Sequence, residues 1–358
     1  MDRIRFAVIG IGGFGLKRIN SILRSKVAEL AYVVDANEEL VRSVSKRVGV
    51  NTVSFDELLS RRDYDVAIIA TPNVFHEKLA TKLLKSGRDV WCEKPMTISI
   101  ESSRRMFMKS IENGSMLKVG SNPRYFPNIV KATELIKQGY IGRILFFRGW
   151  IGNEGLHLLS KSWYTRKEMV GGGTLIDNGV HLIDLIRYLA DEIAKCYSCK
   201  LITLKHDLKD LEDNATAIYE LSNGGFAFIH SSWTEKSGYM YFEMHGDEGY
   251  IHIDSRWSKA IITYGKSGDE PTCEDYTQYP KMSYDIELED FVRDYREGFH
   301  PKPTSYDGYR AVKIIMQSYL TATRGSPMTT FDASDRELEK AFLKRFNVRD
   351  AYIRPQEV

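Results

Sequence analysis

The chain has 358 residues, which is more than one hydrophobic core usually holds, so two domains are expected. With 43% hydrophobic residues, 27% charged residues and a formal net charge of +2, the composition excludes the strongly basic surface typical of nucleic-acid-binding proteins. No apolar run approaches the length of a membrane span and no signal peptide opens the sequence, so we expect a cytoplasmic protein.

The cysteines are too few and too scattered for a disulfide framework, so reduced thiols are expected. They are Cys92, Cys196, Cys199 and Cys273. Cys196 and Cys199 have the spacing of half a zinc site, but no second pair of cysteines or histidines lies at a matching distance. We therefore expect no metal, and we interpret these two cysteines as strand residues.

Residues 1–122 alternate short apolar runs with helical stretches, which predicts a parallel sheet covered by helices. The apolar runs are almost uninterrupted, as in strands that are buried on both faces. The expected strands are residues 5–9, 30–34, 66–70, 89–92 and 117–119. The expected helices are residues 16–23, 38–48, 55–59, 76–86 and 100–113.

A glycine-rich loop at residues 10–15 follows the first expected strand and opens the first helix. Glycines in this pattern allow a tight turn, a close approach of the backbone to a pyrophosphate and close packing of the helix on the strand. Asp35 ends the next strand, where a carboxylate can bond the adenosine ribose and repel a 2′-phosphate. The pattern predicts a site for NAD, with NADP disfavoured. The alternative is a glycine-rich turn with Asp35 as a strand-end cap; Lys17 and Arg18 are interpreted as solvated helix residues.

From residue 144 onward, strand-like runs follow one another with turns between them, which predicts a mostly antiparallel sheet. The expected strands are residues 215–221, 225–233, 240–244, 250–253 and 260–264. Helices at residues 179–190, 286–297 and 307–323 are expected to cover one face of this sheet. A second copy of the chain is then expected to cover the other face, in a homodimer or homotetramer. The expected domains are residues 1–122 and 123–358, and no function is assigned to the last thirty residues.

Further motifs follow the glycine-rich loop in a specific order. They are Ala70-Thr71-Pro72-Asn73 with His76, Glu93-Lys94-Pro95, Gly120-Ser121-Asn122, the run from Gly171 to His181 with Asp184, and Asp307-Gly308-Tyr309-Arg310-Ala311. Over nearly its whole length the chain resembles the glucose-fructose oxidoreductase and inositol dehydrogenase family. The resemblance implies an α/β fold with an N-terminal Rossmann domain and a C-terminal α+β domain that contains an open, mostly antiparallel sheet. It also implies NAD-dependent oxidation of a secondary alcohol on a cyclic sugar or polyol.

The resemblance assigns residues to the cofactor and to the substrate. The cofactor would contact Gly10, Gly12, Gly13, Phe14, Gly15, Asp35, Thr71, Pro72, Asn73, His76, Glu93, Lys94 and Asn122. The substrate would contact Lys94, Arg124, Trp163, Asp177, Asn178 and His181. Pro123 is a departure, because in the family basic residues commonly follow the asparagine directly.

Alcohol oxidation needs a group that takes the hydroxyl proton while hydride leaves the same carbon. His181 suits this task because imidazole titrates near neutrality. Asp177, four residues earlier, would share its helix face and orient the imidazole or bond the substrate hydroxyl. Lys94 would stabilise the developing alkoxide. The alternative for these three catalytic candidates is a solvated lysine, a helix cap and a surface histidine.

Two further interpretations concern the surroundings of these residues. The glycines at residues 171–173 would let the backbone lie close to the cofactor or the substrate. The other histidines outside these motifs are interpreted as structural: His157, His206, His230, His245, His252 and His300.

Other functions compatible with these motifs are a reductase of a keto-sugar or nucleotide-sugar and a redox-neutral glycosidase that uses bound NAD. A non-catalytic NAD-binding regulator is a different class of protein. Such a regulator can dispense with the catalytic lysine and histidine, and this chain contains both Lys94 and His181.

Overall fold

The computed structural model describes residues 2–155 and 163–349, and within them two compact units. The first unit contains residues 2–122 and two later segments, Lys281–Tyr309 and Glu337–Arg349. The second contains the described residues of Pro123–Pro280 together with Arg310–Arg336. The sequence-based division after residue 122 did not include these two returning segments, because chain order alone does not show where a late helix packs. His157 lies outside the described residues.

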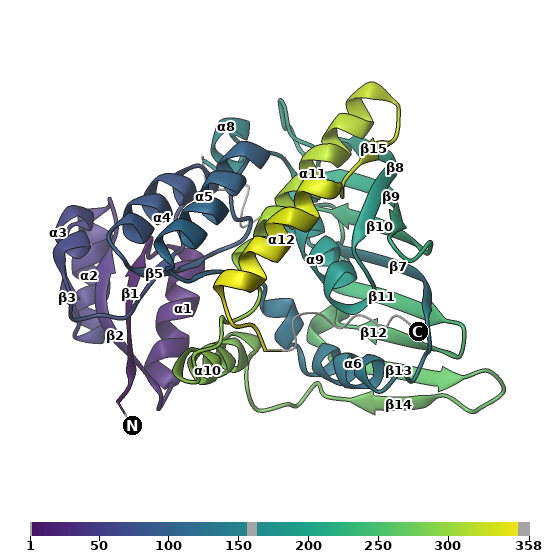
Figure 1. Ribbon diagram of the computed structural model, residues 1–358, viewed down its shortest axis with the longest axis horizontal. Helices are drawn as coiled ribbons and strands as arrows, with labels where there is room; N and C mark the ends of the chain where they lie inside the picture. The colour runs from purple at the N-terminus through teal and green to yellow at the C-terminus, as the bar shows by residue number, and fades with distance from the viewer. Residues whose placement is uncertain (1, 156–162, 350–358) are drawn as a thin grey trace. The chain divides into compact units, whose positions relative to one another are not determined.

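The first unit is built on a six-stranded parallel sheet with the strand order β3-β2-β1-β4-β5-β6 (Figure 1). This order is that of the dinucleotide-binding Rossmann fold, so the predicted fold of the N-terminal domain is confirmed. The strands are β1 (Ile4–Ile9), β2 (Ala28–Val34), β3 (Asn51–Thr52), β4 (Val66–Ile69), β5 (Asp89–Cys92) and β6 (Leu117–Val119). The short strand β3 was not expected from the sequence, because its two exposed residues leave no apolar pattern.

Helices connect these strands, and capping residues mark their ends. They are α1 (Gly13–Arg24), α2 (Glu38–Val48), α3 (Phe55–Ser60), the short helix η1 (Asn73–Phe75), α4 (His76–Lys85) and α5 (Ile100–Asn113). The side chain of Asn37 accepts a bond from the first turn of α2, and Gly49 ends that helix in the left-handed conformation. Ser54 and Glu57 form a capping box on α3. The observed helices agree with those expected within a few residues.

Helix α10 (Ser283–Arg296) corrects one expectation. The sequence analysis placed residues 286–297 on the antiparallel sheet, but α10 belongs to the first unit. Phe291 stacks on Trp91 of β5, with ring centroids 4.9 Å apart, and also contacts Phe6 of β1. The prediction of a helix here was therefore correct, but the prediction of which sheet its apolar face covers was wrong. The first unit also contains α12 (Ala333–Arg345) from Glu337 onward.

The second unit contains a nine-stranded sheet with the strand order β14-β13-β12-β11-β7-β10-β9-β8-β15. All neighbouring strands are antiparallel except β10 and β7, which are parallel, so the predicted mostly antiparallel sheet is confirmed. The strands are β7 (Ile144–Gly152), β8 (Ile193–Ile202), β9 (Asn214–Leu221), β10 (Phe226–Ser232), β11 (Tyr239–Gly246), β12 (Gly249–Asp254), β13 (Ile261–Lys266), β14 (Thr272–Asp275) and β15 (Met328–Thr329).

The helical segments of the second unit include a long, partly π-helical run. They are η2 (Asn122–Tyr125) from Pro123 onward, α6 (Pro127–Lys137), α8 (Lys167–Val170), the π-helical segment Leu175–Gly179 that continues into α9 (Val180–Leu189), η4 (Arg256–Ser258) and α11 (Ser305–Arg324) from Arg310 onward. None of the described helices in either unit is long and apolar enough to cross a membrane.

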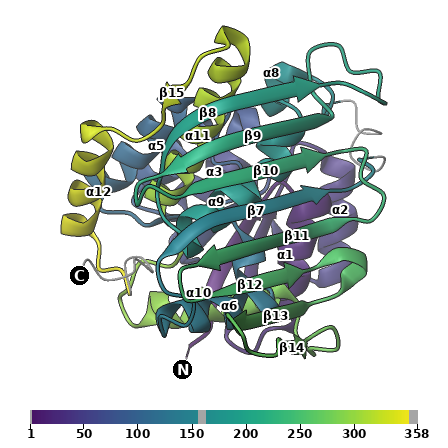
Figure 2. The same cartoon turned by 90° about the vertical axis from the view of Figure 1, so that its right-hand side faces the viewer.

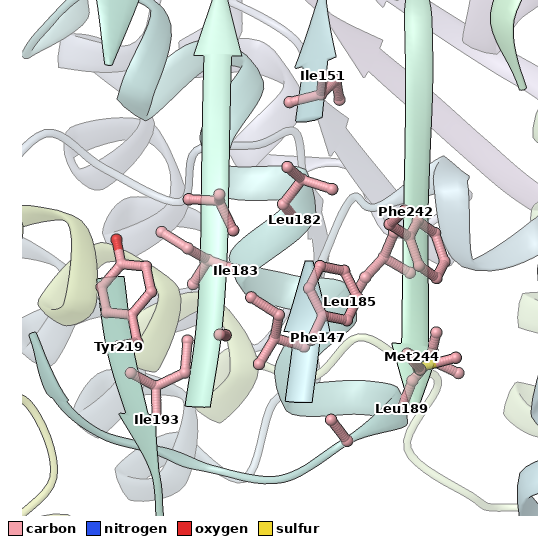
Figure 3. Packing of buried hydrophobic residues seen from close by; sticks show 14 of the residues in the cluster. Phe147, Ile151, Leu182, Ile183, Leu185, Leu189, Ile193, Tyr219, Phe242 and Met244 are labelled. Atoms are coloured by element: carbon pink, nitrogen blue, oxygen red, sulfur yellow. The ribbon is translucent and has the colours of Figure 1, made fainter. Parts of the chain in front are cut away.

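One face of the nine-stranded sheet is the core of the second unit. Side chains of α9, such as Leu182 and Leu185, meet Phe147 of β7 and Phe242 of β11, all of them fully buried (Figure 3). The two phenylalanine rings stack with centroids 4.9 Å apart. Burial of one such side chain contributes about 1.5–3 kcal/mol, so α9 is held firmly against the sheet.

The opposite face of this sheet is open in the second unit. Figure 2 views it directly, and no described helix of that unit lies in front of β7 to β12. Its side chains form cross-strand rows: Phe226, Phe146, His245 and Tyr250 in one row, and Phe228, Arg148, Glu243 and His252 in the next. We call this surface, formed by the outward residues of β7, β10, β11 and β12, the open sheet face.

Candidate functional site

The cofactor-binding candidates of the first unit follow the carboxyl ends of its parallel strands. The glycine-rich loop follows β1, Asp35 follows β2, Thr71 follows β4 by one residue and Glu93 follows β5. Because the strands are parallel, these positions share one edge of the sheet, where ligands of such folds bind.

The glycines of the loop have distinct roles. Gly10 has a φ of +83°, which favours glycine, and Gly15 lies so close to Gly10 that a Cβ atom would come within 1.9 Å of the Gly10 carbonyl oxygen. At Gly12 a Cβ atom would meet nothing within 4 Å, so this part of the loop faces open space. Gly12 is also the N-cap of α1 and provides no side-chain cap. The first N–H groups of α1 are therefore suited to an anion.

Asp35 joins the second strand to the glycine-rich loop. Its Oδ2 accepts a hydrogen bond of 2.9 Å from the N–H of Ile11, and its Oδ1 accepts one of 2.9 Å from the N–H of Asn37. Each carboxylate oxygen retains a lone pair, so Asp35 can still accept bonds from ribose hydroxyls.

His76 supports the loop that follows β4. It is fully buried, with Nδ1 3.0 Å from the carbonyl oxygen of Pro95 and Nε2 2.9 Å from that of Thr71. Burial lowers the pKa of His76, so the ring is neutral and one of its nitrogens donates. His76 thus packs between Thr71 and the segment after β5 and donates to the carbonyl oxygen of one of them. The hydroxyl oxygen of Thr71 is buried and has no hydrogen-bond partner among the described residues, as expected of a group that a ligand satisfies.

Glu93 lies within a buried network of charges that the sequence analysis did not anticipate. Nε of Arg18 lies 2.5 Å from Oε1 of Glu93, and Nη1 of Arg18 lies 2.6 Å from Oε2 of Glu287. Nζ of Lys118 lies 2.8 Å from Oε1 of Glu287. Lys94 directly follows this network, with Nζ 5.8 Å from the centroid of the Phe14 ring in the glycine-rich loop.

The interpretation of Arg18 as a solvated residue is wrong, because only 2% of its surface is exposed. Burial works to lower the pKa of Arg18, but Glu287 and Glu93 outweigh it and raise the pKa. Burial works to raise the pKa of Glu287, but Arg18 and Lys118 outweigh it and lower the pKa. Arg18 and Glu287 therefore remain ionised, and the bond from Arg18 to Glu93 helps to hold the segment before Lys94 in place.

These features fit a bound dinucleotide. The loop has an open approach at Gly12, uncapped N–H groups in α1, an acidic strand end at Asp35 and an unsatisfied hydroxyl at Thr71. Pro72 and Asn73, which begin the next short helix, lie at the same sheet edge. Asn122 is held by a 3.0 Å bond from its Nδ2 to the hydroxyl of Ser283.

In the second unit, Asp177, Asn178 and His181 lie on one continuous helical run that changes from π to α geometry at Val180. All three are buried. Tyr164 donates a 2.8 Å bond to Oδ1 of Asp177, and Nε1 of Trp233 donates a 3.0 Å bond to Oδ2. The helix predicted from the spacing of Asp177 and His181 is present, and π-helical turns often occur at functional sites.

Tyr164 and Trp233 are site residues that the sequence analysis did not connect with Asp177. Burial, together with the neighbouring carboxylate, holds the pKa of Tyr164 well above its ordinary value, so the hydroxyl stays protonated and donates. Trp163, a substrate candidate, lies beside Tyr164 with ring centroids 4.7 Å apart. In the sequence, the aromatic pair before the glycine run was the signal for Tyr164. The bond from Trp233, which follows β10, to Asp177 could be seen only in the folded structure.

Glu212 is a second residue that the sequence analysis missed. Its carboxylate accepts bonds from the N–H groups of Gly173 and Leu175, at 3.1 and 3.0 Å, and from the hydroxyl of Tyr319 at 2.9 Å. It therefore caps the start of the helical run that carries Asp177.

The glycines before this helix have a packing reason within the second unit. A Cβ atom at Gly173 would come within 1.9 Å of the carbonyl oxygen of Glu212, and one at Gly172 within 2.1 Å of the hydroxyl of Tyr319. Gly171 has a φ of +89° at the end of α8. Glycine is thus required at Gly172 and Gly173 by protein contacts, and the close approach of this run to the cofactor or the substrate stays a prediction.

Arg124, a substrate candidate, forms a buried ion pair with Asp184 of α9. Its Nε and Nη2 lie 2.8 and 2.5 Å from the two carboxylate oxygens, and its guanidinium lies 4.4 Å from the centroid of the Tyr188 ring. This side chain ties η2 to α9 whatever else it contacts. Asn178 similarly donates to the carbonyl oxygen of Ser232 at 3.2 Å and so ties the helix to β10.

Comparison with known proteins identifies the family. Residues 4–121 match the model of the oxidoreductase family with an NAD-binding Rossmann fold, and residues 129–252 match that of the GFO/IDH/MocA C-terminal domain. The chain belongs to the GFO/IDH/MocA family of oxidoreductases. The predicted resemblance, the two-part fold and the NAD-binding class of the N-terminal domain are thereby confirmed.

Similar members of the GFO/IDH/MocA family include a scyllo-inositol 2-dehydrogenase (NAD(+)) from Bacillus subtilis, 25% identical over 91% of this chain and 96% of that protein. A levoglucosan dehydrogenase from Pseudarthrobacter phenanthrenivorans is 26% identical over 79% of this chain and 77% of that protein. Among solved structures, a levoglucosan dehydrogenase in complex with NADH and L-sorbose aligns with a TM-score of 0.82 and 23% identity. It covers 93% of this chain and 100% of that one.

Proposed function

We propose that the protein is an NAD-dependent dehydrogenase that moves hydride between a secondary alcohol of a cyclic sugar or polyol and nicotinamide. The observation that carries the proposal is the helical run with Asp177 and His181, in a chain whose other unit presents a dinucleotide loop and Lys94. The relatives named above are dehydrogenases of inositols and of an anhydrosugar, which supports this substrate class.

NAD, when bound, accepts the hydride. In the proposed mechanism His181 takes the hydroxyl proton, and Lys94 stabilises negative charge on the oxygen as hydride leaves. Asp177 keeps lone pairs beyond those that Tyr164 and Trp233 occupy, so it can accept a bond from the substrate or from the imidazole. The two aromatic donors fix the carboxylate before substrate arrives, which lowers the cost of ordering it.

We also propose that the protein works in the cytoplasm, as a homodimer or homotetramer formed through the open sheet face. The cysteines of the described residues are unpaired, which fits a reducing compartment. Exposed aromatic side chains on the open sheet face, such as Phe226, support an interface there.

The proposed activity is tested by supplying NAD with inositols, aldoses and sugar acids in turn and following the absorbance of the reduced cofactor. We expect reduction with at least one cyclic polyol or aldose. If the protein binds NAD but reduces it with none of these compounds, the proposal is overturned.

A further inference from the structure

The open sheet face brings together two histidines and a carboxylate that the proposed reaction does not use. Glu243 and His245 lie two residues apart on β11, so their side chains emerge from the same face of the sheet. His252 of β12 is paired directly with Glu243 across the antiparallel ladder. One potential ligand atom from each of these residues lies within 4.8 Å of the other two.

We propose that Glu243, His245 and His252 form a binding site for one divalent transition-metal ion such as Zn²⁺. Two imidazoles and a carboxylate are a ligand set that zinc accepts, at about 2.0–2.2 Å from each ligand atom, with a fourth position for water. The ligand atoms lie within 4.8 Å of one another, so the side chains must rotate closer together before all three can reach one ion. This inference does not depend on the proposed dehydrogenase activity.

The state of His252 favours this role. Its Nε2 is buried, has no hydrogen-bond partner among the described residues and lies 3.7 Å from Oε2 of Glu243, too far for a hydrogen bond. A neutral imidazole with an unsatisfied nitrogen is the form that binds a metal.

The rings and the carboxylate of the site are held by their neighbours. His245 stacks on Phe146 of β7 with ring centroids 4.6 Å apart, and Tyr250 lies 4.9 Å from His252. Glu243 is only 5% exposed. Ordering of this kind before binding reduces the entropy lost when an ion is bound.

The positive charge of Arg148 opposes a cation at this site, because its guanidinium pairs with Oε1 of Glu243. In the single chain the Arg148 side chain is 64% exposed, so water screens its charge there. Oε2, the oxygen that faces His252, accepts a long 3.3 Å bond from the hydroxyl of Tyr241. Arg148 on the other oxygen would act as the outer hydrogen-bond partner that metal-binding carboxylates usually have.

The test is calorimetric titration of the untagged, chelator-treated full chain with Zn²⁺, in a Cys273→Ser background that removes the exposed thiol. We expect one ion per chain, at least tenfold weaker binding in His245→Ala, His252→Ala and Glu243→Gln, and equal or tighter binding in Arg148→Gln. His230→Ala is the matched control, because His230 lies on the same face on β10 but outside the cluster. Circular dichroism verifies that each variant is folded.

A second measurement replaces zinc with Co²⁺ and records its visible absorption, which is intense for tetrahedral sites and weak for hydrated ions. We expect the intense bands in the starting protein and in His230→Ala, and their loss in His252→Ala. No stoichiometric binding in the starting protein, or equal weakening by His230→Ala and His252→Ala, would overturn the proposal.

Discussion

Asp177 shows how single residues of the site could be predicted only in part. Its position near His181 could be predicted from their spacing in the sequence, because both residues lie on one helical run. Two of its hydrogen-bond donors, Tyr164 and Trp233, lie 13 and 56 residues away in the sequence, and no local pattern connects them with Asp177. The same holds for Arg18, whose partner Glu287 is 269 residues distant. Local spacing predicts the chemical groups, whereas their partners depend on the tertiary fold.

The role of His181 gives a prediction at this scale. His181→Ala should lower turnover by roughly 10²–10⁴-fold, the range for loss of a general base, while the dissociation constant for NAD changes little. Steady-state kinetics and a cofactor titration measure the two effects. His230→Ala, a change on the open sheet face, is the control and should leave turnover unchanged. Near-normal turnover in His181→Ala would remove the histidine from the mechanism.

Asp35 gives a second prediction, on cofactor choice. Its carboxylate at the end of β2 should favour NAD, because NADP would place a second anion beside it. Asp35→Asn keeps the shape but removes the charge, so we expect the preference for NAD to shrink at least several-fold. Calorimetric titration of both proteins with both cofactors measures this ratio. Equal or tighter binding of NADP by the unaltered protein would contradict the idea.

At the scale of elements, helix α10 explains which part of the fold could not be predicted. Its apolar positions were visible in the sequence, but an amphipathic helix can cover either of two sheets. Leu288 and Phe291 join the core of the parallel sheet, and Glu287 beside them pairs with Arg18 and Lys118. A buried acid inside an apolar helix face was the signal that this helix needs a basic partner, but the sequence does not show which one.

The glycine run before the Asp177 helix gives a prediction about an element. Gly173→Ala places a Cβ atom against the carbonyl oxygen of Glu212, so the backbone must move, at a cost of roughly 1–3 kcal/mol in the free energy of unfolding. Urea denaturation measures it. Gly12→Ala is the matched control for stability, since its added Cβ atom would meet nothing within 4 Å. Equal stability of both variants would show that Gly173 is not required by packing.

The ion pairs of Glu192, which lies just before β8, with Arg187 of α9 and Arg310 of α11 give a prediction on pH. Burial works to raise the pKa of Glu192, but Arg187 and Arg310 outweigh it and lower the pKa to about 2. Because the folded pKa is depressed, this stabilisation is present above the ordinary value near 4.5 and is lost as the pH falls toward 2. The free energy of unfolding at pH 7, measured by urea denaturation, should therefore be higher for the unmodified protein than for Glu192→Gln. The difference between the two proteins should shrink between pH 5 and pH 3. A difference that is constant with pH would refute this assignment.

At the scale of the whole molecule, the number of units and their fold classes were predictable because periodicity changes from β–helix alternation to strands joined by turns. The metal-binding candidates were not, since His245 and His252 meet Glu243 only through the register of β11 and β12. The sequence analysis accordingly left both histidines as structural. Strand β7 was also missed, although it completes the centre of the sheet, because its outward residues mask an alternating pattern. The interpretation of Cys196 and Cys199 as strand residues is confirmed, since both lie on β8.

The open sheet face leads to the prediction about assembly. A soluble chain rarely exposes so many neighbouring aromatic side chains, and a stable interface needs about 800 Å² from each partner. Phe226, which is 51% exposed and stacks on Phe146, lies within this surface.

Phe226→Glu would bury an unpaired charge in an interface formed there, so we expect the mass from light scattering to fall to that of one chain or of a smaller assembly. Leu23→Glu is the control, since Leu23 is equally exposed at 50% but lies on α1 of the other unit. If the unaltered protein is a monomer across the micromolar range, or if both variants keep its assembly, then the open sheet face is not where two copies meet.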